Sequence, residues 1–130
     1  MKKHPDVTVK LIFRYKNKIL ILKQPRGIIS LPGGRMEWKE SILGALNREL
    51  KEELNYSLEN EPKLFDVWNY ISKSGGRHSV MIYFIQYLTK KPKFSSPEKL
   101  KILWLTKKEI LSKNIIKDKK FVDKIFNWGK

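Results

Sequence analysis

Three glutamates near the middle of the chain are spaced so that they can share a metal ion. Glu49, Glu52 and Glu53 are three and four positions apart, which places them on one face of an α-helix. Like charges on such a face repel each other by roughly a few tenths of a kcal/mol per pair. A divalent cation relieves this repulsion, and clustered carboxylate oxygens suit a hard ion such as Mg²⁺ or Mn²⁺. The spacing therefore favours a metal site that substrate phosphates would complete.

The same segment also fits an ordinary surface helix that is rich in glutamate and solvated. In that interpretation Arg48 pairs with Glu52 at i,i+4 and no ion is needed. The residues upstream favour the metal site, because a glycine pair, Gly33-Gly34, and a further acid, Glu40, precede the helix at short distance.

Residues 34–56 resemble the signature of the Nudix hydrolase family, which includes the MutT-like proteins. That signature reads Gly, five residues, Glu, seven residues, Arg-Glu, an aliphatic residue, any residue, Glu-Glu, any residue, Gly and an aliphatic residue. The matching positions here are Gly34, Glu40, Arg48, Glu49, Leu50, Glu52 and Glu53. The resemblance implies a single domain over residues 1–130, folded as a Nudix-like α/β/α sandwich with a mixed central β-sheet.

The resemblance also implies a reaction: hydrolysis of a phosphoanhydride in a nucleoside diphosphate linked to another group, by attack of metal-activated water on phosphorus. The implied ligands of Mg²⁺, or of Mn²⁺, are Glu49, Glu52, Glu53 and a backbone carbonyl of the Gly33-Gly34 segment. Arg48 would orient the carboxylates by ion pairing, and Glu40 would support the site from behind the ligands.

Two positions depart from the family pattern at the end of this helix. Asn55 stands where the signature has glycine, and asparagine is the best substitute for glycine in the left-handed conformation that ends a helix. Tyr56 replaces an aliphatic residue. We expect the fold to tolerate both.

Other candidate residues lie outside the signature. Glu98 precedes a predicted strand and is the candidate general base, with an ordinary solvated acid as the alternative. Trp68 and Tyr70 share one face of a strand, where they would stack a base or fill the core. Arg26 and Arg77 lie by turns and are candidates for phosphate contact. The two histidines, His4 and His78, are expected to be structural or solvated.

The surrounding pattern predicts the elements that position these residues. Alternating or apolar runs predict strands at 7–13, 19–22, 64–72, 78–88 and 100–105, with hairpins joining the first two and the third and fourth. Apolar spacing predicts helices at 41–54 and 118–128, and a capping box predicts another helix that starts at Thr106. Residues 31–34 are predicted to form a tight loop.

Composition narrows the class of partner. The 130 residues carry a net charge of +15, which favours anionic partners, and the lysines are spread along the whole chain. The sequence contains no run of eighteen apolar residues, so no membrane span is predicted. The basic start leads into a strand and not into a signal peptide. The absence of cysteine fits a cytoplasmic setting. We expect a nucleotide-like small molecule as substrate and a monomer or homodimer. A catalytically silent nucleotide- or RNA-binding protein of the same fold is the alternative, although RNA is not favoured.

Overall fold

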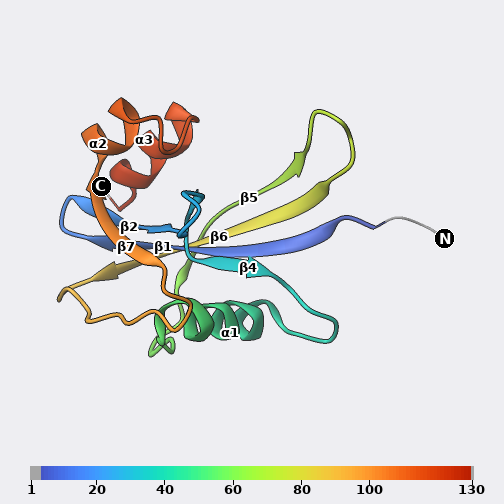
Figure 1. Cartoon of the computed structure of the whole chain (residues 1–130), viewed down its shortest axis with the longest axis horizontal. Helices are drawn as coiled ribbons and strands as arrows, with labels where there is room; N and C mark the ends of the chain where they lie inside the picture. Colours follow the sequence, from blue (N-terminus) through green and yellow to red (C-terminus); the bar gives the residue numbers. More distant parts are fainter. Residues whose placement is uncertain (1–3, 130) are drawn as a thin grey trace.

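A mixed β-sheet forms the middle layer of the molecule (Figure 1). The structure is a computed structural model that describes residues 4–129, so the expectations for residues 1–3 lie outside the described residues. The strands of this part of the chain are β1 (Asp6–Tyr15), β2 (Lys18–Lys23), β3 (Ile29–Ser30), β4 (Gly33–Arg35), β5 (Lys63–Ile71), β6 (His78–Leu88) and β7 (Lys101–Thr106). Both predicted hairpins are confirmed, because β1 pairs antiparallel with β2 and β5 pairs antiparallel with β6.

The sheet forks along one edge of β1, and this fork positions the candidate site. The strand order is β3-β2-β1-β6-β5, with β1 and β6 parallel over their whole length. On its other side β1 pairs with β4 at residues 8–10 and with β2 at residues 14–15. β2 and β4 therefore separate along β1, and Lys10 is the last β1 residue paired with β4 before they do.

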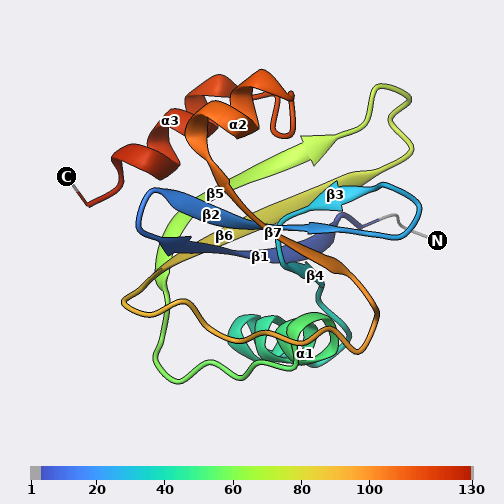
Figure 2. The same ribbon diagram turned by 60° about the vertical axis from the view of Figure 1, so that its left-hand side comes forward.

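Helices cover both faces of the sheet, which confirms the predicted α/β/α sandwich (Figures 1 and 2). Helix α1 (Ile42–Leu54) lies on one face, and α2 (Lys107–Ser112) and α3 (Lys119–Asn127) lie on the other. Alternate residues of β1 point to opposite faces. Val9, Leu11 and Phe13 therefore pack with α1, whereas Ile12 packs with α3.

The ends of α1 follow the predicted capping chemistry. The Ser41 hydroxyl accepts a hydrogen bond from the Gly44 N–H at 3.0 Å, so the helix begins one residue later than predicted. Asn55 adopts the left-handed conformation, with φ 52° and ψ 41°. Tyr56 packs its ring edge-on against Phe13 and Phe94, which gives it the apolar role that the signature assigns to this position.

The prediction of a tight loop at residues 31–34 was wrong for residues 33 and 34. Gly33 and Gly34 belong to β4, which pairs with Val9 and Lys10 of β1. Gly33 has φ +125°, and a Cβ there would lie 2.1 Å from the Val9 carbonyl oxygen. The glycine therefore serves a close approach of two strands, and the short strand β3 was likewise not predicted.

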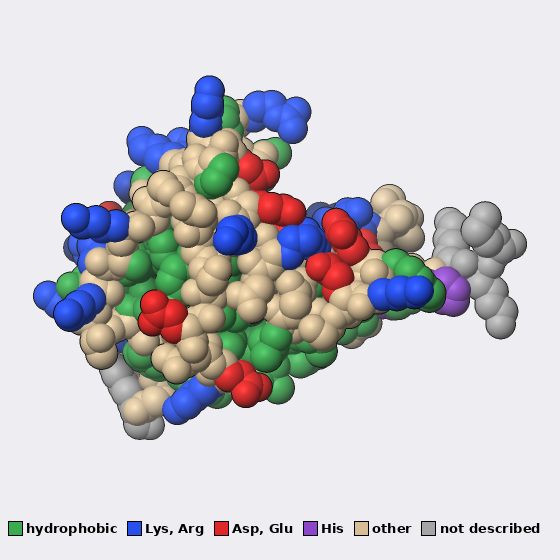
Figure 3. All heavy atoms as spheres, turned by 90° about the horizontal axis from the view of Figure 1, so that it is seen from below, with side chains coloured by type: hydrophobic (Ala, Val, Ile, Leu, Met, Phe, Trp, Pro, Cys, Tyr) green, Lys and Arg blue, Asp and Glu red, His purple; other side chains and the backbone are tan. Residues whose placement is uncertain are grey.

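Strand β5 forms an open edge of the sheet. Among the described residues its hydrogen-bonded strand neighbour is β6 alone, and its side chains Leu64, Val67 and Ile71 are each about half exposed. Viewed from the α1 side, lysine and arginine side chains are spread over the face of the molecule, with acidic side chains between them (Figure 3). Within residues 4–129 no helix has both the length and the apolar character needed to cross a bilayer.

Candidate metal and active site

Two glutamates of α1 are fitted directly against the glycine strand β4. The Glu53 Oε1 accepts a hydrogen bond from the Gly33 N–H at 2.7 Å. The Glu49 carboxyl lies so close to Gly34 that a Cβ at that position would be 2.5 Å from the carboxyl carbon. Residue 34 must therefore be glycine for the Glu49 carboxylate to occupy the space beside β4, whereas residue 33 must be glycine because the β1 backbone at Val9 lies against it.

Arg48 links α1 to the loop that precedes it through a bidentate ion pair with Glu40. Its Nε and Nη2 donate to the two Glu40 carboxylate oxygens at 2.7 and 2.9 Å, and its Nη1 donates to Glu49 at 3.0 Å. The Glu37 N–H also donates to Glu40, at 2.7 Å. These hydrogen bonds, Arg48 first, lower the pKa of Glu40 to about 2. The guanidinium therefore fixes the orientation of the Glu40 and Glu49 carboxylates.

Glu52 is more exposed than Glu49 and Glu53. Its side chain is half exposed, and its Oε1 lies 3.4 Å from Arg48 Nη1, the same nitrogen that donates to Glu49. Between residues 4 and 129 no three acidic, histidine or cysteine side chains are gathered closely enough to hold an ion. The three glutamates share a helix face as predicted, but without an ion their carboxylates have protein partners: Arg48 Nη1 donates to Glu49 and Glu52, and the Gly33 N–H donates to Glu53.

The electrostatics of the site nevertheless suit a cation. The pKa of Glu53 is raised to about 7: burial is the main cause, the Gly33 N–H and Lys10 oppose the rise, and the charges of Glu49 and Glu98 add to it. Burial also raises the pKa of Glu49. Two half-buried carboxylates with raised pKa values carry negative charge that the protein only partly compensates, and oxygen donors in this number suit Mg²⁺ or Mn²⁺.

Glu98 lies in the loop that joins β6 to β7. Its side chain is exposed, yet its charge contributes to the raised pKa of Glu53. The fold therefore brings this loop near the helix carboxylates across a sequence separation of more than forty residues. Among the hydrogen bonds of the described residues, none joins Glu98 directly to Glu53.

Lys10 belongs to the site and was missed by the sequence analysis. It extends from β1, and its Nζ donates to the carbonyl oxygens of Leu31 at 3.0 Å and Gly33 at 3.2 Å. A lysine placed between the apolar residues Val9 and Leu11 of the strand was the signal available in the sequence. Its role depends on the pairing of β1 with β4, which was not predicted.

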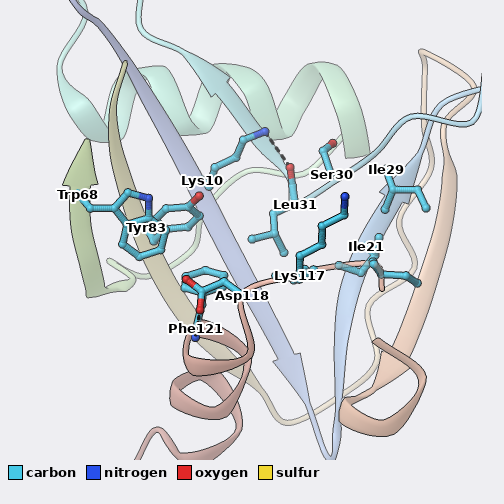
Figure 4. A pocket seen from close by; sticks show the side chains of 12 residues that line it. Lys10, Ile21, Ile29, Ser30, Leu31, Trp68, Tyr83, Lys117, Asp118 and Phe121 are labelled. Atoms are coloured by element: carbon cyan, nitrogen blue, oxygen red, sulfur yellow. Dashed lines mark hydrogen bonds between the residues drawn. The ribbon is translucent and has the colours of Figure 1, made fainter. Parts of the chain in front are cut away.

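A cavity of about 430 Å³ opens beside Lys10, on the sheet face that carries α3 (Figure 4). Trp68, Tyr83 and Phe121 form its aromatic wall, with ring centroids 4.5 to 5.0 Å apart. Polar groups of Lys10 and Asp118 also face it.

The other predicted substrate residues are placed differently. Tyr70 shares the strand face of Trp68 but is about half exposed and does not line this cavity. Arg26 is exposed in the turn before β3 and is not among the lining residues either. Arg77 is exposed and does not line the cavity, although its positive charge contributes to lowering the pKa of Lys10. The imidazoles of His4 and His78 are exposed, in agreement with their predicted solvated state.

The layered fold, the glycine strand and the helix that carries its glutamates define a class of protein, and comparison with known sequences agrees with it. The NUDIX domain family matches residues 2–128. The chain belongs to this family, and the resemblance noted in the sequence is confirmed.

Known proteins of this kind are similar over much of the chain. A curated ADP-ribose pyrophosphatase of Methanocaldococcus jannaschii is 34% identical over 86 residues, which are 63% of this chain and 50% of that protein. The chain thus matches about half the length of this relative. Among solved structures, a MutT protein of Methanosarcina mazei is 18% identical with a TM-score of 0.76, covering 98% of this chain and 96% of that one. A MutT protein of Bacillus halodurans is 27% identical with a TM-score of 0.71, covering 94% and 82%.

Proposed function

We propose that the protein is a pyrophosphohydrolase that uses Mg²⁺, or Mn²⁺, to hydrolyse a phosphoanhydride in a nucleoside diphosphate derivative. The observation that carries the proposal is the fit of Glu49 and Glu53 against the glycine strand, with Arg48 and Glu40 fixing the register. Glu49, Glu52, Glu53 and the Gly33 carbonyl would hold the metal. When bound, such an ion lowers the pKa of water and neutralises charge on phosphoryl oxygens.

The neighbouring cavity supplies a place for the nucleoside. Its volume of about 430 Å³ accommodates a base and its sugar, and Trp68 offers a flat ring on which a base can stack. Because Lys10 lines the cavity and also contacts Gly33, the phosphates of a bound nucleotide would extend past Lys10 toward the glutamates of α1. Arg77 would add positive charge on this path.

The experiment is a panel of nucleotides incubated with the protein and Mg²⁺, followed by measurement of phosphate release and product masses. The panel contains nucleoside triphosphates, ADP-ribose, nucleotide sugars, dinucleoside polyphosphates and capped RNA; ADP-ribose is included because of the name of the curated relative. Activity should vanish in excess chelator and return with Mg²⁺ or Mn²⁺. Full turnover in chelator contradicts the proposal, and tight nucleotide binding with no turnover of any substrate favours the silent binding protein instead.

Glu98 is our proposed general base, on the ground that its charge reaches Glu53 from a separate loop. We predict that Glu98→Gln lowers kcat by about 10²–10⁴-fold and changes KM much less. Glu61→Gln, at an exposed glutamate before β5, is the matched control. A fall in kcat of less than about threefold would place the base elsewhere, within the α1 segment.

A further inference from the structure

Lys10 brings a positive charge to the place where the proposed metal would bind. Its Nζ donates to the Leu31 and Gly33 carbonyl oxygens at 3.0 and 3.2 Å. The side chain reaches from β1 to Leu31 at the rim of the aromatic cavity (Figure 4). The Gly33 carbonyl oxygen is also one of the metal ligands in the proposed function. The Lys10 ammonium therefore already donates a hydrogen bond to one of the proposed metal ligands.

Gly33 is held at both of its backbone groups by side chains of opposite charge. Its N–H donates to Glu53 at 2.7 Å, and its carbonyl accepts from Lys10 at 3.2 Å. Lys10 and Gly33 are also direct partners in the pairing of β1 with β4. Hydrogen bonds therefore connect the Glu53 carboxylate, the Gly33 backbone and the Lys10 ammonium in series. We expect a change at either side chain to affect the other.

The charge of Lys10 is balanced by the carboxylates that would receive the metal. Burial lowers the pKa of Lys10, and Glu53 and Glu49, in that order, partly offset this by stabilising the charged form. In this half-buried setting charges interact more strongly than they do in water. A divalent ion placed among Glu49, Glu53 and the Gly33 carbonyl would be repelled by the ammonium and would compete with it for the same oxygen atoms.

We propose that Lys10 is a built-in cation that competes with the divalent metal and thereby sets the affinity of the site. Without metal, its ammonium holds the Gly33 carbonyl and compensates Glu49 and Glu53. The metal then binds weakly until an anionic nucleotide enters the cavity beside Lys10 and supplies the missing negative charge. This inference rests on the proposed function, because it takes the glutamates of α1 and Gly33 as the metal ligands.

The test is calorimetric titration of Mn²⁺ into the full chain in the absence of nucleotide. Lys10→Met removes the charge and keeps the length of the side chain, and we expect it to bind Mn²⁺ about tenfold more tightly than the wild type. Lys10→Arg restores the charge and should stay within about threefold of the wild type. Lys108→Met removes an exposed lysine of α2, on the sheet face opposite α1, and should leave the Mn²⁺ affinity unchanged. This variant controls for the net charge of the protein.

Each outcome bears on a different claim. If Lys10→Met binds Mn²⁺ as well as the wild type does or more weakly, or if Lys108→Met tightens binding equally, the competition is refuted. If Lys10→Met does not fold, Lys10→Gln replaces it, because the neutral amide can still donate to a carbonyl, and the same tightening is expected. A wild-type chain that binds no Mn²⁺ even with nucleotide present overturns the proposed function itself, whereas a wild type that binds and hydrolyses while the Lys10 variants match it overturns this inference alone.

Discussion

Arg48 connects the helix to the chain that precedes it. It donates to both Glu40 oxygens, to Glu49 and to the Arg35 carbonyl, at distances between 2.7 and 3.0 Å. Arg35 follows Gly34 directly, so a single guanidinium fixes the end of β4, the connecting loop and α1 relative to one another. The planar fork of arginine is suited to this, and lysine could not make the same contacts.

The Glu40–Arg48 ion pair makes a prediction about acid stability. Arg48 and the Glu37 N–H hold the pKa of Glu40 at about 2, below its ordinary value of 4.5. A carboxyl whose pKa is lowered by folding stabilises the protein above pH 4.5, and that contribution is lost as pH falls toward 2. The difference in unfolding free energy between wild type and Glu40→Gln should therefore be largest above pH 4.5 and shrink in acid. Denaturant unfolding across this range measures it, and a constant difference would show that the ion pair does not form in solution.

Glu53 should affect activity and stability in opposite directions. Glu53→Gln keeps an oxygen that can accept from Gly33, but it removes a buried charge and its repulsion of Glu49. We predict that metal-free stability is unchanged or rises by roughly 0.2–0.5 kcal/mol, whereas activity falls at least about a hundredfold. Lys51→Gln, on the exposed face of α1, should change neither quantity. Thermal unfolding in chelator and turnover with Mg²⁺ give the two readouts; a variant that remains fully active removes Glu53 from the metal site.

The signature residues were predictable one by one, but their neighbours were not. Fixed offsets along the chain identify Glu40, Arg48 and Glu49 because a helix turns a sequence interval into a position in space. Lys10 and the cavity residue Asp118 are far from the signature in sequence. They reach the site through strand pairing and helix docking, which a local pattern does not specify.

The end of α1 is where this chain departs from its family, and the structure explains why the departure is tolerated. Asn55 has φ 52°, a conformation that costs a residue with a β-carbon about 1–2 kcal/mol unless its side chain is asparagine or aspartate. We predict that Asn55→Gly changes the unfolding free energy by less than about 1 kcal/mol, and that Asn55→Ala lowers it by about 1 kcal/mol. Chemical denaturation compares the two variants. A large loss of activity in Asn55→Gly would reveal a role for the asparagine side chain beyond ending the helix.

Helices were predicted more accurately than short strands, for a physical reason. The termini of α1, α2 and α3 carry their own capping residues, Ser41, Thr106 and Asp118, so each helix start is encoded locally. Strand β4 has three residues, two of them glycine, and exists because β1 offers it hydrogen-bonding partners. Glycine pairs favour loops in isolation, and tertiary pairing overrode that preference.

At the scale of the whole molecule, the proposed base site and the proposed metal site lie on opposite faces of the sheet. The cavity lies on the α3 face, the glutamates come from α1 on the other face, and β1 with Lys10 lies between them. A continuous sheet would separate the two groups. In the proposed binding mode, a nucleotide would extend from its base in the cavity past Lys10 to its phosphates at the point where β2 and β4 diverge from β1.

The open edge of β5 has a consequence for how separate copies of the protein behave in solution. A strand with unpaired backbone groups and exposed aliphatic side chains is a template for edge-to-edge association, and a net charge of +15 opposes it through mutual repulsion between molecules. The range of that repulsion shrinks from about 10 Å at 0.1 M salt to about 3 Å at 1 M. We therefore predict that the chain sediments as a monomer at low ionic strength and self-associates reversibly as salt is added. Val67→Lys, which places a charge on the open edge, should remain monomeric throughout; wild-type protein that stays monomeric at 1 M salt would show that the edge is protected by its shape and not by colloidal repulsion.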